Sequence, residues 1–156
     1  MNSLRLTKVC LFLLCAGCGA GALPQRYPSR PPAGMTATQA GQDENACVAV
    51  AADATAERAW TYISCMVSKG HSVGVAFHVH ASPTYLGVTQ TRPHDPLVIA
   101  AELEECRRFG YAAGRSEGGT RDMIVDRMEA AFRSCLDPRG YVVQRQAEPT
   151  TTRPRR

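Results

Sequence analysis

The feature that most constrains the fold is a motif that occurs twice, once around Cys65 and once around Cys135. In each copy an aromatic residue stands one helical turn before the cysteine, a base and a glycine follow it, and a valine lies three residues beyond the glycine. The base suits the negative end of a helix, and the glycine favours the left-handed conformation that ends many helices. Each copy therefore predicts a helix, a stop and the start of a strand, which indicates two related modules.

Four cysteines lie downstream of the first 20 residues: Cys47, Cys65, Cys106 and Cys135. In an exported chain an even number of cysteines predicts disulfides, and four cysteines allow three pairings. We favour Cys47–Cys65 with Cys106–Cys135, because each bridge then joins the two helices of one module. The pairing across modules, Cys47–Cys106 with Cys65–Cys135, is the alternative. A straight helix would separate Cys47 and Cys65 by about 27 Å, so the favoured pairing also predicts a turn near residues 53–57.

The beginning of the chain has the charge and hydropathy pattern of an export signal. Arg5 and Lys8 precede an apolar run over residues 9–16, which is too short to span a bilayer. Small residues then lead to Cys18, and the segment Ala16-Gly17-Cys18-Gly19 resembles a bacterial lipoprotein signal.

The resemblance to lipoprotein signals implies cleavage before Cys18 and acyl chains, palmitate among them, on that cysteine. Because Gly19 is not Asp, the resemblance implies anchoring in the outer membrane, facing the periplasm. Cleavage after Ala22, which would release a soluble secreted protein, is the alternative.

These signals divide the chain into five parts: a signal peptide (1–18), a disordered Pro/Gly-rich tether (19–42), a first two-Cys module (43–91), a second two-Cys module (92–143) and a disordered basic tail (144–156). The predicted fold is mainly α with a small β component. It consists of two disulfide-stapled helical hairpins, each ending in a short extended strand.

Local signals place the helix starts and the strands. Thr55 and Thr120 suit helix N-caps, and Asp95 followed by Pro96 suits an N-cap and first helical position. A first helix is expected from residue 43 or 44, and strands are expected over residues 73–81 and 85–91.

Two histidines, His78 and His80, stand two apart in one of these expected strands. Residues at that spacing point to one face of a strand, so both imidazoles could share a metal. The favoured interpretation is a solvent-exposed strand face without metal, because no cysteine or carboxylate at metal-ligand spacing stands nearby. No cofactor is expected.

The second module ends in Cys135-Leu136-Asp137-Pro138-Arg139-Gly140-Tyr141-Val142-Val143 and contains Glu105-Cys106-Arg107. These segments resemble those of small bacterial envelope proteins of glycine-zipper type, without the Gly-rich zipper itself. The resemblance implies residence in the envelope and paired cysteines, and it implies no catalytic chemistry.

The expected function is therefore that of a non-enzymatic cell-envelope lipoprotein, an interaction or structural module with no catalytic residues. The expected partner is the membrane, reached through the N-terminal acyl chains; no protein partner is identified. The formal net charge of +4 is small and scattered, which argues against nucleic-acid binding. A periplasmic metal-binding or thiol-redox protein, using His78 and His80 or the module cysteines, is the alternative.

Overall fold

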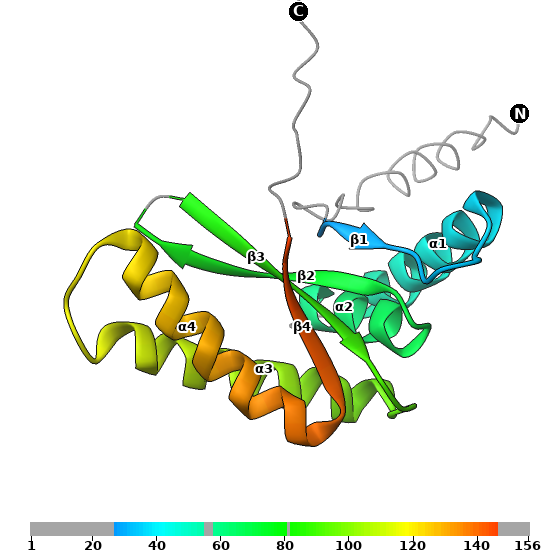
Figure 1. The fold of residues 1–156 in the computed structure, drawn as a ribbon. Coiled ribbons are helices and arrows are strands. Elements are labelled where there is room, and N and C mark those ends of the chain that lie inside the picture. The colour runs from blue at the N-terminus through cyan, green and yellow to red at the C-terminus, as the bar shows by residue number, and fades with distance from the viewer. Residues whose placement is uncertain (1–26, 55–57, 81, 147–156) are drawn as a thin grey trace, which may run out of the picture.

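The computed structural model describes residues 27–54, 58–80 and 82–146, which form four helices, a short 3-10 turn and four strands (Figure 1). The helices are α1 (Ala37–Asp53), α2 (Arg58–Ser68), α3 (Pro96–Arg115) and α4 (Arg121–Leu136), and the 3-10 turn is η1 (Asp137–Arg139). The strands are β1 (Ser29–Arg30), β2 (Ser72–Val79), β3 (Ser82–Gln90) and β4 (Tyr141–Gln146).

The strands form one sheet in the order β1-β2-β3-β4, and each neighbouring pair is antiparallel. Strands β2 and β3 make a hairpin, and β4 joins the free side of β3 after the chain has passed through α3 and α4. Val88 of β3 is consequently paired with Val73 on one side and with Val143 on the other. Strands from both expected modules therefore share a single sheet.

The expected fold class, mainly α with a small β component, is wrong. The described residues form a mixed α/β fold with four helices and a four-stranded antiparallel sheet. Two helical hairpins with a strand after each do exist, but they are not separate units. Val73, Val75 and Phe77 of β2 are almost completely buried, because their strand lies between its neighbours and under the helices. Pairing between distant strands cannot be read from local periodicity, so the sheet was missed.

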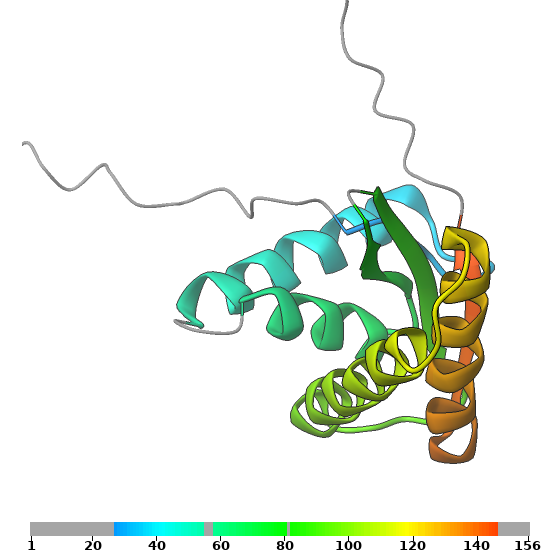
Figure 2. The ribbon, with the colours of Figure 1, turned by 90° about the vertical axis from the view of Figure 1, so that its left-hand side faces the viewer.

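The core lies between the sheet and the helices. Phe77 of β2 has its ring 5.0 Å from that of Phe132 in α4 and 5.2 Å from that of Tyr111 in α3. Each helix contacts the next one in the chain, and Figure 2 shows α1, α2 and α3 in succession beside the sheet. The core is thus continuous from α1 to β4.

Side-chain caps fix three of the helix starts. Asp95 accepts from the Leu97 N–H with Pro96 in the first turn, and Thr120 accepts from the Met123 N–H, as predicted for both. Helix α1 begins earlier than predicted, because Thr36 and Gln39 form a reciprocal capping box. The predicted cap Thr55 lies outside the described residues.

The ordered structure reaches beyond the two expected modules at both ends. Strand β1 and the first turns of α1 lie in residues 19–42, which were expected to be a disordered tether, and β4 continues to Gln146 in the expected tail. Among the described helices, none combines the length and apolar character needed to cross a membrane.

Candidate functional site

The four module cysteines form two disulfides, Cys47–Cys65 and Cys106–Cys135, with Cα atoms 5.5 Å apart in each. These are the pairings that the spacing favoured, and each joins the two helices of one hairpin. Cys47 and Cys106 are fully buried, and their partners are partly buried against the same core. Both bridges are therefore part of the hydrophobic core.

The predicted lipidation site, Cys18, and the alternative cleavage site at Ala22 lie outside the described residues. Both remain predictions.

His78 and His80 do not project from one strand face. His78 is exposed in β2, whereas β2 ends at Val79 and His80 lies in the following turn with a left-handed φ of 55°. Among the described residues no group of three or more His, Cys, Asp or Glu side chains is placed to hold a metal ion.

A third histidine, His71, is buried where α2 passes into β2. Its Nε2 lies 3.1 Å from Oδ2 of Asp43 in α1, and the ammonium group of Lys69 donates to Oδ1 of the same carboxylate at 2.9 Å. The hydrogen bond from Lys69, followed by that to His71, holds the pKa of Asp43 below its usual value. This cluster fastens α1 to the turn after α2.

A second cluster of polar groups lies beneath the start of β4. The ring of His94 stacks on Tyr141 with centroids 5.0 Å apart, and the Tyr141 hydroxyl donates to Oε2 of Glu102 at 2.6 Å. Burial, and then the hydrogen bond to Glu102, raise the pKa of Tyr141 above its usual value. The Tyr141 hydroxyl is therefore a hydrogen-bond donor at neutral pH, and it connects β4 to α3.

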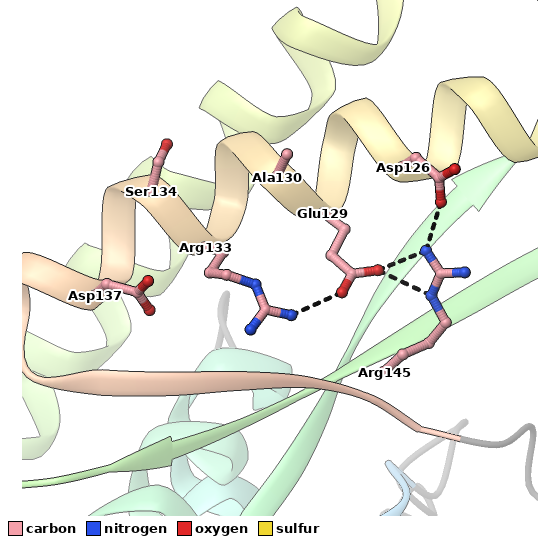
Figure 3. Close-up of a pocket in the computed structure, with 7 residues that line it drawn as sticks. All are labelled: Asp126, Glu129, Ala130, Arg133, Ser134, Asp137 and Arg145. Carbon is pink, nitrogen blue, oxygen red and sulfur yellow. Dashed lines mark hydrogen bonds and ion pairs between the residues drawn. The ribbon is translucent and has the colours of Figure 1, made fainter.

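A shallow groove runs along α4 beside strand β4, with a volume of about 500 Å³ (Figure 3). We call it the α4–β4 groove. Its lining residues are Asp126, Glu129, Ala130, Arg133, Ser134, Asp137 and Arg145. All but Arg145 belong to α4 or η1 at helical spacings of three or four, so they share one side of the helix.

Ion pairs cross the α4–β4 groove. The guanidinium of Arg145 donates to Asp126 Oδ1 and, through Nε, to Glu129 Oε2, at 2.8 Å in each case. Arg133 donates to the other oxygen of Glu129 at 2.8 Å. Asp126 and then Glu129 raise the pKa of Arg145 above its usual value. Glu129 thus contacts both guanidinium groups, as Figure 3 shows.

The groove offers ion pairing and hydrogen bonding. Its hydroxyl group, that of Ser134, donates to the carbonyl of Ala131 at 2.9 Å, and neither histidine nor cysteine lines the groove. The carboxylates of Asp126 and Asp137 are exposed to solvent. These groups can form ion pairs and hydrogen bonds with a bound molecule.

Sequence reasoning missed this groove. The spacing of Glu129 and Arg133 is a helical ion-pair signal that was available. Arg145 was assigned to the tail, and its position across from Asp126 depends on the pairing of β4 with β3, which the local pattern does not reveal.

Comparisons of this chain with protein-family models, with curated proteins and with solved structures found no match.

Proposed function

We propose that this chain is a non-catalytic lipoprotein of the bacterial cell envelope, whose folded part is a disulfide-stabilised interaction domain. The leader directs export, Cys18 carries the acyl chains, and the folded part faces the periplasm from the outer membrane. The resemblance of Cys135–Val143 to small envelope proteins agrees with this location.

The observation that carries the proposal is the pair of core disulfides, one in each helical hairpin. Structural disulfides form and persist in oxidising compartments such as the periplasm and are rare in the cytosol. An export signal at the start of the same chain accounts for how the cysteines would reach an oxidant.

The non-catalytic part of the proposal is supported by the partners of the buried polar groups. His71 contacts Asp43, which also binds Lys69, and Tyr141 is bound to Glu102. Each of these contacts links two elements of the fold, so these side chains have a structural use.

The mass of the protein recovered from its own cells tests the proposal. We expect a chain that begins at Cys18, carries acyl chains and has four cysteines that resist alkylation until a reductant is added. A Cys18→Ser variant should lack the acyl mass and keep both disulfides. A cytosolic chain that retains Met1 and reacts at all its thiols would refute the proposal, and an unacylated chain beginning at Leu23 would replace anchoring with secretion.

A further inference from the structure

We propose that the outer edge of β4 and the α4–β4 groove bind an extended, basic segment of a partner protein, which adds to the sheet as a further strand. This inference rests on the proposed function as an interaction domain and names its binding surface and the chemistry of its partner.

In the part of the chain that the structure describes, the outer edge of β4 carries unpaired backbone groups. The Thr91 N–H donates to the Gly140 carbonyl at 2.8 Å, and the β3–β4 register continues from there without a break. Along an antiparallel strand, the backbone N–H and C=O groups of successive residues point alternately toward and away from the neighbouring strand. The groups that point away from β3 are therefore those of Tyr141, Val143 and Arg145. Within the described residues no strand pairs with this side and no backbone hydrogen bond reaches these groups.

The opposite edge of the sheet is protected. Strand β1 pairs with the first residues of β2, and the Gly74 N–H donates to the Pro28 carbonyl at 2.7 Å. Further along β2, the His78 N–H donates to the Tyr111 hydroxyl at 2.9 Å. Proteins usually block the edges of sheets, because an open edge invites a further strand. Among the described residues one edge of the sheet is covered and the other is open, which directs strand addition to β4.

The α4–β4 groove lies where the side chains of an added strand would point. Alternate side chains of such a strand face the helical side of the sheet, and they would meet the exposed side of α4. Ala130 and Ser134 are short and exposed there, which leaves room for incoming side chains. In binding by strand addition, main-chain hydrogen bonds supply affinity and such depressions supply specificity.

The charge of the groove selects a basic occupant. The groove is lined by three carboxylates and two guanidinium groups, so its formal net charge is −1. Glu129 pairs with both Arg133 and Arg145, and Arg145 also pairs with Asp126. The side chain of Asp126 is 66% exposed, and Asp137 is also exposed, one near each end of the groove. Lysine or arginine side chains on the added strand would meet these carboxylates.

The same charges disfavour a second copy of this chain as the occupant. Arg145, near the end of β4, is ion-paired with Asp126, and Tyr141, at the start of β4, follows the turn that contains Asp137. Antiparallel pairing of two β4 strands about Val143 would therefore bring Asp126 of each copy toward Asp137 of the other. Juxtaposed like charges oppose such an interface.

Peptide binding to the exported protein, with both disulfides closed, tests the charge. The probes are two fluorescent peptides, one alternating Lys with Thr and one alternating Glu with Thr. We expect the Lys peptide to bind and the Glu peptide not to bind. The double variant Asp126→Asn/Asp137→Asn should weaken binding by about fivefold, as the loss of two exposed ion pairs implies. The control Asp122→Asn removes an exposed carboxylate of α4 outside the groove and should bind like the parent. Equal binding of both peptides, or no binding of either, would overturn the proposal.

Amide hydrogen exchange tests the place of binding. In the free protein the amides of Val142 and Gln144 should exchange slowly, and those of Val143 and Arg145 rapidly. The Lys peptide should slow the exchange of Val143 and Arg145. Protection that appears instead at Ala76 in β2, or that grows with protein concentration in the absence of peptide, would refute binding of a basic peptide at β4.

The two proposals fail in different experiments. Absence of peptide binding leaves the lipoprotein assignment intact, because that assignment depends on the mature mass. A cytosolic, uncleaved chain removes the envelope assignment, whatever the groove binds.

Discussion

Val73 of β2 and Val143 of β4 lie in register on opposite sides of the same residue of β3, Val88, and both are completely buried. They are the corresponding valines of the duplicated motif. Since β3 is antiparallel to both neighbours, β2 and β4 run in the same direction. The strands that follow the two copies of the motif, β2 and β4, therefore pair with the two sides of β3.

Because the two valines are equivalent, truncating either should have a similar effect. We expect Val73→Ala and Val143→Ala each to lower the free energy of unfolding by about 2 kcal/mol, since each removes two buried methylene equivalents. Urea unfolding of the oxidised protein measures this. Val142→Ala is the matched control, because Val142 is 40% exposed, and its effect should stay within about 0.5 kcal/mol. A large loss in the control would contradict the assigned faces of β4.

The disulfides should account for much of the stability of this small core. Replacing Cys106 and Cys135 together by Ala opens a loop with a sequence separation of 29, and replacing Cys47 and Cys65 opens one of 18. Loop-closure entropy predicts a loss of about 3 kcal/mol for each bridge, slightly more for the longer loop. Urea unfolding of the two double variants measures the losses. Unchanged stability in either variant would show that the bridge has no effect on the unfolded chain.

The duplicated motif and the cysteine spacing predicted the parts of this fold that depend on short stretches of sequence. Gly70 and Gly140 end their segments in left-handed conformations, with φ of 85° and 88°, as the motif indicated. The cysteine pairing was favoured because each bridge joins the two helices of one predicted hairpin. These features were predictable because each depends on neighbouring residues or on two helices adjacent in the sequence.

The features that depend on distant pairing were not predictable in this way. The alternation of Val73, Val75 and Phe77 indicates a strand. It does not predict that the neighbouring strand β3 also pairs with β4. The α4–β4 groove follows from that pairing, because Arg145 reaches Asp126 only when β4 lies beside α4. The sheet and the candidate site were therefore missed together, for one reason.

Two glycines should respond in opposite ways to replacement by alanine. Gly41 lies in α1 with open space around the position of a Cβ, so Gly41→Ala should raise the free energy of unfolding by about 1 kcal/mol through helix propensity. Gly70 has open space too, its nearest neighbour being Pro32 at 3.9 Å, but its φ is positive. Gly70→Ala should therefore cost about 1 kcal/mol in backbone strain. Urea unfolding checks both values, and a gain in stability at Gly70 would contradict the left-handed turn.

The link between Asp43, Lys69 and His71 should make stability depend on acid. The folded-state pKa of Asp43 lies below the ordinary value, so the unfolded chain binds the proton more readily. The stability that this carboxylate contributes is then complete above about pH 4, the usual pKa range of an aspartate, and is lost as the pH falls through the lowered pKa. Asp43→Asn should destabilise the protein at neutral pH, and the difference from the parent should shrink in acid.

Urea unfolding of the parent and of Asp43→Asn, repeated between neutral pH and about pH 3, measures that difference. The matched control is Glu44→Gln, since Glu44 is exposed in the same helix, next to Asp43. Its difference from the parent should stay small. A constant difference for Asp43→Asn across the pH range would mean that α1 is held to the turn after α2 by packing and the Cys47–Cys65 bridge, with no contribution from the charge of Asp43.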